Sequence, residues 1–448
     1  MTKIKITVVG GGLAGSLMAV YFAKRGYEVK VFERRPDMRN TDISAGKSIN
    51  LALSTRGLRA LEKVGLKEDI LKDAIPMNGR TMHSETGELS YQPYGTEGQY
   101  INSVSRGGLN IQLLELADEN EHVQLFFNHK CLDIDFENSI AIFENENGER
   151  VTEKSDFIIG GDGAFSAVRM AMQTSSRMDF SQDFLDHGYK ELTIPPTKDG
   201  QFAMEPNSLH IWPRGEYMMI ALPNPDKTFT CTLFYPFEGK NSFDTIKTEQ
   251  DLMNFFNEHF HDAVPMMPTL TEDFFSNPTG SLVTVRCYPW VKEKAALIGD
   301  ACHAVVPFFG QGMNCAFEDC VVLDECLTKH NDNVEAAFAE YQKLRKINAD
   351  SIADLALQNF VEMRDLVGDE EFLHYKNIEH DLCELHPDLF QSQYEMVTFT
   401  NIPYYEAKVK GEANTKLVKK IIANGWEDRI TNRTFVLELM EQRDLPSA

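Results

Sequence analysis

The stretch with the clearest chemical potential is "LIGDACHAVVPFFGQGMNCAFEDC", residues 297–320. An apolar, strand-like start meets Gly299 and Asp300, and a loop almost without charge follows. A charged residue between a buried strand and a neutral, glycine-bearing loop indicates that the loop contacts something other than protein. Asp300 is therefore a candidate ligand-binding residue.

A second candidate site is the glycine-rich segment near the start of the chain. "IKITVV" predicts a strand, Gly10, Gly12 and Gly15 follow with GxGxxG spacing, and a helical pattern and a second strand lead to Glu33. Glycines let backbone N–H groups approach a pyrophosphate at a helix N-terminus, and the acid can bind a ribose hydroxyl. GxGxxG alone is weak evidence. Here, however, the strand, the glycines, the helix, the second strand and the acid follow one another with the expected spacing, so the segment predicts a dinucleotide site that binds the adenosine end.

A third segment, "DFIIGGDGAFSAVR" (156–169), contains Asp162 and predicts a strand, a turn and a helix start. On its own it is best interpreted as one more strand-to-helix turn. Asp300, in contrast, suits the ribityl hydroxyls of a flavin. The "GQGMN" of 310–314 can present backbone N–H groups to the pyrimidine edge of the flavin, where negative charge collects on reduction.

In this order and spacing, the three segments resemble the single-component FAD-dependent aromatic hydroxylases. In that family the middle segment serves both FAD and NAD(P)H, and the last one holds the ribityl chain. From the first strand to about Ala407 the chain is similar, more closely, to the kynurenine 3-monooxygenase branch. The matching segments are "GKSINLALSTRGLRALEKVGL" (46–66), "IPMNGRTMHS" (75–84), "YQPYGTEGQYINSVSR" (91–106), "HGYKELTIPP" (187–196), "AMEPNSLHIWPR" (203–214) and "VPFFGQGMNCAFEDC" (306–320).

The resemblance implies bound FAD, transient NADPH, O2, and L-kynurenine as the substrate. The implied reaction is hydroxylation to 3-hydroxy-L-kynurenine through a flavin C4a-hydroperoxide, within tryptophan degradation. The implied cofactor-binding residues are Gly10, Gly12, Leu13, Ala14, Gly15, Glu33, Arg34, Arg35, Ala52, Arg106, Cys131, Asp162, Ala167, Asp300, Gly312, Met313 and Asn314.

A carboxylate-bearing aromatic substrate requires a cation for its carboxylate and an apolar slot for its ring. Arg80 can bind a carboxylate bidentately, which lysine cannot, although an arginine is more often a surface residue. The resemblance implies that Arg80 and Tyr94 bind the kynurenine carboxylate, with Tyr394 close by.

The resemblance also supplies candidates around the rest of the substrate. Leu355, Asn359 and Met363 share one face of a predicted helix at i, i+4 spacing, and Asn359 is implied to be a buried partner of Tyr394. Phe308 and Phe309 are implied to lie against the substrate ring and the isoalloxazine, although an aromatic pair is usually core.

We assign no catalytic acid or base and no metal site. His303 is expected to be a packed residue near the flavin phosphate. The reaction does not require an imidazole base, because the amino group of the substrate already activates its ring. The histidines lack metal-ligand spacing, and the eight cysteines contain no CxxC pair. Cys315 and Cys320 lie too far apart on a predicted helix to bind one metal ion together.

Composition excludes several classes of partner. The formal net charge of -24 argues against nucleic acid and against an anionic membrane surface. No run of about 18 apolar residues predicts a membrane span, and no signal peptide is evident at the N-terminus. Reduced thiols and the N-terminus favour the cytoplasm. The resemblance implies a soluble, bacterial-type form, since the charged, amphipathic tail does not resemble the membrane-anchoring C-terminal helix of the animal members, and a homodimer is possible.

The predicted fold class is α/β, with a Rossmann-like FAD-binding domain, an inserted β-sheet substrate domain and a helical C-terminal region. The boundaries are 1–75, 100–178 and 285–370 for the first, 76–99 and 179–284 for the second, and 371–448 for the third. We assign to the inserted sheet the strands "YMMIALP" and "FTCTLFY" and the hairpin signal in "FENENGERV".

Two alternative functions stay open. The first is a sister hydroxylase that acts on a substituted kynurenine or another aromatic acid. The second is a flavoprotein that does not hydroxylate, such as a reductase or a sensor that uses FAD as a ligand. The preference between NADPH and NADH is also open.

Overall fold

The computed structural model describes residues 3–40, 50–96, 98–366 and 370–443. Residues 46–49 of the segment "GKSINLALS" and Glu97 of "YGTEGQY" lie outside these ranges. The chain forms two compact units: 1–72, 104–185 and 282–353 make the first, and 73–103, 186–281 and 354–448 make the second. Each unit is described by itself.

The first unit contains the strands and helices β1 (Lys5–Val9), α1 (Leu13–Lys24), β2 (Glu28–Phe32), β3 (Asn50–Leu53), α2 (Thr55–Val64), α3 (Lys67–Asp73), α4 (Arg106–Asp118), β8 (Val123–Phe126), β9 (Lys130–Asp135), β10 (Ile140–Glu144), β11 (Arg150–Lys154), β12 (Phe157–Gly160), α5 (Ala167–Ser175), β18 (Val291–Lys292), β19 (Ala295–Leu297), α8 (Asp300–His303) and α9 (Gly312–Lys329). The second contains β4 (Ile75–Met77), β5 (Gly79–His83), β6 (Leu89–Pro93), β14 (Ser208–Pro213), β15 (Met218–Pro223), β16 (Phe229–Pro236), α6 (Glu249–His259), α7 (Leu270–Ser276), α11 (Glu370–Leu385), α12 (Gln393–Thr398), α13 (Tyr404–Ala423) and α14 (Arg433–Glu441). Besides α3, whose last residue Asp73 falls in the second unit, four elements run from one unit into the other: β7 (Ile101–Ser105), β13 (Asp179–Ile194), β17 (Thr279–Tyr288) and α10 (Val334–Val361).

The main sheet of the first unit has the strand order β18-β19-β12-β1-β2-β8. β19, β12, β1, β2 and β8 run parallel, and β18 is an antiparallel edge. Its central strands are apolar runs, as expected where helices cover both faces of a parallel sheet. The carboxyl ends of β1 and β12 lie together, since Val9 pairs with Gly160, and ligands of open α/β sheets bind at such ends.

The hairpin predicted at "FENENGERV" is present, but in a different sheet from the predicted one. β10 and β11 pair antiparallel on either side of the turn, and Asn145 N donates to Glu149 O at 3.0 Å. Together with β9 they form a separate three-stranded sheet within the first unit. The prediction that this hairpin belongs to the inserted sheet is therefore wrong.

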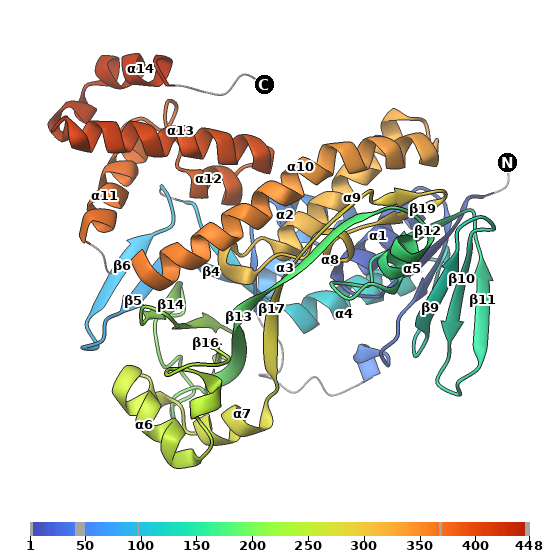
Figure 1. Cartoon of the computed structure of the whole chain (residues 1–448), viewed down its shortest axis with the longest axis horizontal. Coiled ribbons are helices and arrows are strands. Elements are labelled where there is room, and N and C mark those ends of the chain that lie inside the picture. The colour runs from blue at the N-terminus through green and yellow to red at the C-terminus, as the bar shows by residue number, and fades with distance from the viewer. Residues whose placement is uncertain (1–2, 41–49, 97, 367–369, 444–448) are drawn as a thin grey trace. The chain divides into compact units, whose positions relative to one another are not determined.

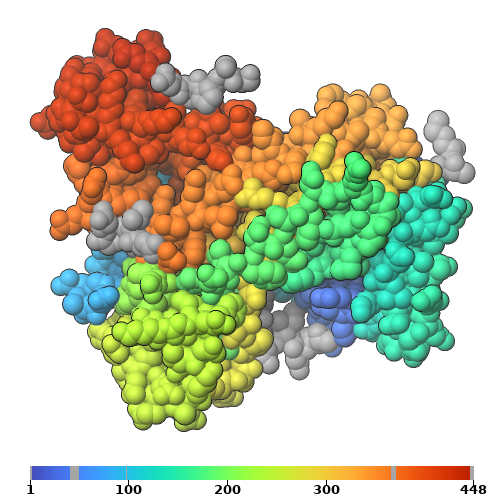
Figure 2. Space-filling view, in the orientation of Figure 1, coloured from blue at the N-terminus to red at the C-terminus, as the bar shows by residue number. Residues whose placement is uncertain are grey.

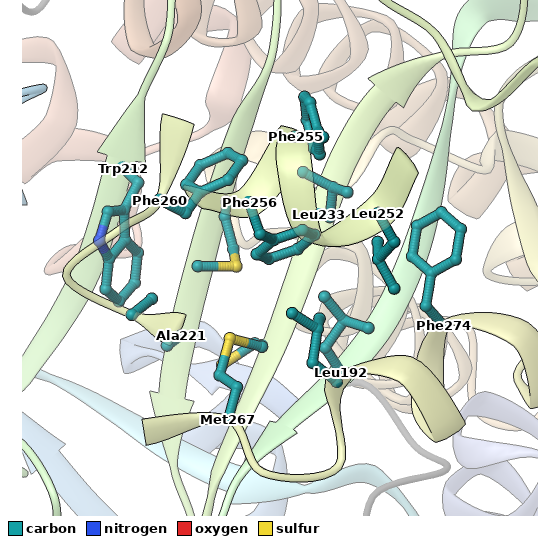
Figure 3. Packing of buried hydrophobic residues seen from close by; sticks show 14 of the residues in the cluster. Leu192, Trp212, Ala221, Leu233, Leu252, Phe255, Phe256, Phe260, Met267 and Phe274 are labelled. Carbon is teal, nitrogen blue, oxygen red and sulfur yellow. The ribbon is translucent and has the colours of Figure 1, made fainter. Parts of the chain in front are cut away.

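The second unit is built on a seven-stranded sheet with the order β17-β13-β16-β15-β14-β5-β6. The strands "YMMIALP" and "FTCTLFY" form its β15–β16 hairpin. One face is covered by α6 and α7, and Figure 3 shows their Phe255, Phe256 and Phe274 packed over side chains of the sheet. Figure 2 shows the outer surface of this layer, where the yellow-green atoms of α6 lie.

The C-terminal part of the second unit is helical, as predicted. α11, α12, α13 and α14 gather in one group of helices (Figure 1). α13 packs on α11 and α12, and a core that includes Leu382, Val418, Ile421 and Val436 holds the group together. None of the helices in the described ranges combines the length and apolar composition that a bilayer crossing requires.

Candidate active site

The turn after β1 has the geometry of a dinucleotide-binding loop. Gly10 has φ +101°, and a Cβ added at Gly15 would lie 1.9 Å from Gly10 O, so neither position accepts a side chain. α1 begins after Gly12 without a side-chain cap, and a Cβ at Gly12 would meet no atom within 4 Å. The helix start thus has open space beside Gly12 and no side-chain cap from the described residues, which suits binding of a pyrophosphate by its N–H groups.

A pocket of about 240 Å³ lies beside this turn. Buried Glu33 accepts hydrogen bonds from Gly11 N at 2.8 Å and from Arg35 N at 2.9 Å. Burial opposes its ionisation, but the Arg35 contacts and Gly11 N–H lower the pKa of Glu33 below its usual value. The pocket is lined by Gly11, Glu33, Arg35, Pro36, Met38, Leu114 and Phe127. An ionised acid at the edge of an otherwise mostly apolar pocket fits an adenosine group with its ribose, so these residues fit FAD.

Asp162 follows β12 and is engaged within its own segment. Its carboxylate accepts hydrogen bonds from Ser166 Oγ at 2.5 Å and from Ala167 N at 2.7 Å, at the start of α5. Burial raises the pKa of Asp162. The carboxylate thus caps a helix, which is the simpler of the two interpretations of this segment. Its cofactor-binding role stays a prediction.

Asp300 opens the short helix α8 and is half-buried. Unlike Asp162, its carboxylate has no hydrogen-bond partner among the residues that the structure describes. A carboxylate that is partly removed from water and unpaired is suited to accept hydrogen bonds from ligand hydroxyls. The loop after it leads to α9 through Gln311, which provides no side-chain cap.

Asn314 lies in the first turn of α9 and is fully buried. Its Nδ2 donates to Ala52 O at 2.8 Å and to Gly310 O at 2.9 Å, and its Oδ1 accepts from Ser54 N at 3.0 Å. The side chain therefore ties β3 to the loop before α9. Both N–H groups of Nδ2 are used in these bonds, so Oδ1, which can accept a second hydrogen bond, is the side-chain atom left for the predicted cofactor contact.

The remaining predicted cofactor residues all belong to the first unit. Gly12, Leu13, Ala14, Ala52, Cys131, Ala167 and Gly312 are half-buried, Met313 is buried, and Arg34, Arg35 and Arg106 are exposed. Burial and then nearby Asp162 raise the pKa of the Cys131 thiol to about 12, so it is a neutral group. Phe308 and Phe309 also lie in this unit, in the 3-10 helix before Gly310, and each is 7% exposed.

The second unit brings together the three predicted carboxylate-binding residues. Arg80 is on β5, Tyr94 directly follows β6, and Tyr394 is on α12. The Arg80 guanidinium carbon lies 5.2 Å from the Tyr94 ring centroid and 5.0 Å from that of Tyr394. The two rings are stacked, with centroids 5.3 Å apart and 9° between their planes.

The polar atoms of this cluster are buried and incompletely paired. Arg80 Nε and Tyr94 Oη have no hydrogen-bond partner in the described part of the chain, and Thr398 Oγ1, one turn after Tyr394, has none either. Arg80 forms no ion pair with a carboxylate of the described residues. Burial raises the pKa of Tyr94 and of Tyr394, so both phenols are protonated at neutral pH and can donate hydrogen bonds.

The sheet face that carries Arg80 is apolar on β14 and β15, whereas on β16 it carries Thr230 and Thr232 beside Phe234. Arg80 pairs with Leu209, and paired residues of neighbouring strands point to the same face. The registers continue this face across β14, β15 and β16, on the side opposite to the α6–α7 layer. Its members there include Leu209, Ile211, Ile220, Leu222 and Phe234. An aromatic ring can lie along such a surface while Arg80 binds an attached carboxylate.

Asn359 and Met363 are neighbours, as the i, i+4 spacing predicted. Asn359 Nδ2 lies 3.3 Å from Met363 Sδ, and both side chains are buried. α10 ends at Val361 and continues as one turn of π-helix, Glu362–Leu366, which packs against β14. π-helical turns inside longer helices occur frequently at functional sites. The pair thus lies near the strand next to that of Arg80.

His303 lies in the first unit and is fully paired in the interior. Its Nε2 is 2.5 Å from Asp319 Oδ2, and together with Cys302 these side chains form a compact group of potential metal ligands. However, Arg345 Nε donates to Asp319 Oδ1 at 2.7 Å. A guanidinium at this distance repels a metal cation, so the group does not fit a metal site.

The comparisons with known proteins agree with this arrangement. The sequence profile of a family described as "FAD binding domain" matches residues 3–356. The kynurenine 3-monooxygenase of Flavobacterium johnsoniae is 46% identical over 98% of this chain and 100% of the relative. That of Myxococcus xanthus is 48% identical over 94% of this chain and 91% of the relative. The Dictyostelium discoideum enzyme is 43% identical, and 96% of each chain is covered.

Solved structures share the fold at lower identity. The tetrameric form of 2-methyl-3-hydroxypyridine-5-carboxylic acid oxygenase superposes with a TM-score of 0.68 at 20% identity, over 82% of this chain and 94% of that one. Pseudomonas aeruginosa PqsL in complex with 2-aminobenzoylacetate gives 0.63 at 19% identity, over 81% of this chain and 99% of that one. The predicted fold class is thereby confirmed.

Proposed function

The chain belongs to the kynurenine 3-monooxygenase family of FAD-dependent enzymes, and we propose that it hydroxylates L-kynurenine to 3-hydroxy-L-kynurenine with NADPH and O2. We assign FAD binding to the first unit and binding of the substrate carboxylate to the second. The physiological role that follows is a step of tryptophan degradation.

The observation that carries the substrate proposal is that Arg80 is buried without a carboxylate partner among the described residues. Its guanidinium lies over two neutral phenol rings, and its Nε is buried without a partner in the described chain. A buried cation without an anion is costly, and a bound carboxylate would offset this cost through paired N–H···O bonds. Tyr94 Oη and Tyr394 Oη are suited to donate further hydrogen bonds to the same carboxylate.

The rest of the substrate must then lie along the sheet face that begins at Arg80, over its apolar residues. An α-amino acid with an aniline ring places an anion at one end and a flat apolar group at the other. Arg80 binds the anion, and the face with Ile211, Ile220 and Phe234 excludes water from the ring. The amino group of L-kynurenine already activates the ring, so the chain need not supply a strong base.

The cofactor side rests on the residues of the first unit. FAD, when bound, would supply the redox chemistry that passes electrons from NADPH to O2. The helix start after Gly12 would hold the pyrophosphate, Glu33 the adenosine ribose, and Asp300 the ribityl hydroxyls. The chain's own contribution is thus orientation and the exclusion of water.

The thiols bear on the cellular location. All eight cysteines are free, and seven of them are buried. Free thiols persist in reducing compartments, which supports the proposal that the enzyme acts in the cytoplasm.

One assay tests the function. Purified protein with bound FAD is mixed with NADPH and L-kynurenine in air, and NADPH loss and 3-hydroxy-L-kynurenine are measured together. We expect product in proportion to NADPH consumed. NADPH loss without hydroxylated product, or faster turnover of a ring-substituted kynurenine at equal concentration, would contradict the assignment.

A further inference from the structure

Two adjacent acids on α9, Glu318 and Asp319, lie in the interior of the first unit. Asp319 is fully buried and Glu318 is 7% exposed, within a helix whose other side chains at this level are mostly apolar. Burial of two carboxylates is unfavourable unless each is paired with cations or hydrogen-bond donors. The binding partners of each carboxylate therefore indicate its structural role.

The partners of the two acids differ. Glu318 forms ion pairs with Arg56, at 2.5 Å, and with Arg345. Asp319 also pairs with Arg345, at 2.7 Å, but its second oxygen accepts from Gly299 N at 2.9 Å and lies 2.5 Å from His303 Nε2. Asp319 is thus the member of this pair that contacts the segment around Asp300.

Gly299 and His303 are the two ends of the turn that carries Asp300. Gly299 is the N-cap of α8 with φ +58° and ψ -142°, a conformation that non-glycine residues rarely adopt, and His303 is the last residue of α8. Gly299 O also accepts from His303 N at 3.0 Å. A single carboxylate oxygen, Asp319 Oδ2, therefore holds both ends of a four-residue helix.

We propose that Asp319 is a positioning residue for the cofactor: it fixes the Gly299–His303 turn and thereby the direction of the Asp300 carboxylate. This inference rests on the proposed function, since it assumes that Asp300 binds FAD. Asp319 is itself fully buried and acts through Gly299 and His303. Because Asp319 already holds this turn in place, FAD binding does not have to pay an entropy cost for ordering it.

The contacts of Asp319 require a carboxylate at this position. Three donors converge on its two oxygens: Gly299 N–H, His303 Nε2–H and Arg345 Nε–H. In Asp319→Asn one oxygen becomes an NH2 group, which is a donor. At least one of the three donors then faces another donor, and the turn loses its fixed conformation.

Glu318→Gln is the matched control. It removes one buried negative charge from the same cluster, one residue away, but the ion pairs of Glu318 are with Arg56 and Arg345 and not with the Gly299–His303 turn. The dissociation constant of FAD is measured by quenching of flavin fluorescence when FAD is added to flavin-free protein. We expect Asp319→Asn to weaken FAD binding by at least about tenfold, and Glu318→Gln by less than about threefold.

Visible circular dichroism of the bound flavin supplies a readout that a loss of stability alone does not change. We expect an altered spectrum for Asp319→Asn and the wild-type spectrum for Glu318→Gln. If Asp319→Asn does not fold, His303→Leu removes one of the two held ends and keeps the Asp319–Arg345 pair. It should weaken FAD binding in the same direction.

The outcomes separate this inference from the proposed function. A wild-type protein that binds no FAD would contradict the proposed function. A wild-type protein that binds FAD, with Asp319→Asn and Glu318→Gln equally weakened or equally unaffected, would overturn the positioning role of Asp319.

Discussion

The phenol rings of Tyr94 and Tyr394 lie parallel, 5.3 Å apart, although one follows a strand of the sheet and the other belongs to a C-terminal helix. The Arg80 guanidinium lies over both rings. The stack holds the two phenols at one place beside the cation, so an incoming carboxylate meets a prearranged set of donors. Three predictions follow from this cluster and from Asp300.

Arg80→Ala should retain FAD but lose affinity for L-kynurenine. Removal of one partner of a buried charge pair costs about 2–5 kcal/mol, which corresponds to roughly 30- to several-thousand-fold in the dissociation constant. Arg80→Lys should recover part of this loss, because an ammonium cannot reproduce the planar fork. The measurement is a titration of the flavin spectrum with L-kynurenine.

Kynuramine, which lacks the carboxylate, is the control ligand for this variant. It should bind the wild type weakly, and Arg80→Ala should change its affinity little. An unchanged affinity of Arg80→Ala for L-kynurenine would show that the carboxylate binds elsewhere.

Tyr394→Phe and Tyr94→Phe should each weaken L-kynurenine while leaving the ring stack in place. Each removes one hydrogen bond to a charged group, worth about 1.5–3 kcal/mol, or roughly 10- to 100-fold in affinity. Tyr91→Phe is the matched control, since Tyr91 lies on β6 and is 55% exposed. If all three variants bind L-kynurenine with equal affinity, the hydroxyl groups of Tyr94 and Tyr394 do not bind its carboxylate.

Asp300→Ala should yield protein with little bound FAD, because the half-buried carboxylate would no longer accept hydrogen bonds from the ribityl hydroxyls. The loss of such charge-assisted bonds predicts roughly a 10- to 100-fold weaker complex. The ratio of flavin absorbance to protein absorbance after purification measures occupancy. Asp226→Ala, in a surface turn far along the chain, should keep wild-type occupancy. Full yellow occupancy in Asp300→Ala would exclude this role.

Local patterns explain which parts of the fold were predictable. The βαβ segment from Gly10 to Glu33 is contiguous, and its glycine spacing, helix and acid have fixed local meanings. The hairpin at Asn147 was likewise predictable as a hairpin, but a turn signal does not specify the third strand. Its assignment to the inserted sheet was wrong for that reason.

Side chains that act through long-range contacts were harder to predict. Asp162 caps its own helix and Asn314 ties β3 to the next loop, tasks that the residue types alone do not distinguish from ligand binding. Asp319 was missed, because an acid on a helix is usually solvent-exposed. The signal that could have found it is its place in the apolar run "CAFEDCVVL" at 315–323.

His303 and Asp319 should give the stability of the chain a defined pH dependence. Burial alone would lower the pKa of His303, but Asp319 raises it well above its usual value near 6.5. Because the pKa of His303 is raised on folding, its protonation adds to the free energy of unfolding. This stabilisation is fully present below about pH 6.5 and is lost as pH rises through the pKa of His303 in the folded protein. Burial would raise the pKa of Asp319, but His303 and Arg345 lower it. That contribution is present above about pH 3.9 and lost as pH falls through the folded value.

His303→Gln should therefore be less stable than the wild type by the largest margin between about pH 5 and 6.5, on the order of 1–3 kcal/mol. The difference in stability should shrink as pH rises above about 6.5, because the folded wild type must then hold a proton that its unfolded chain no longer binds. Urea unfolding of flavin-free protein at pH 5.5, 7 and 9 measures this without the added stability from bound FAD. His261→Gln, at an exposed position, should show no such trend. A margin that stays constant from pH 5.5 to 9 would mean that His303 carries no proton-linked charge in the folded protein.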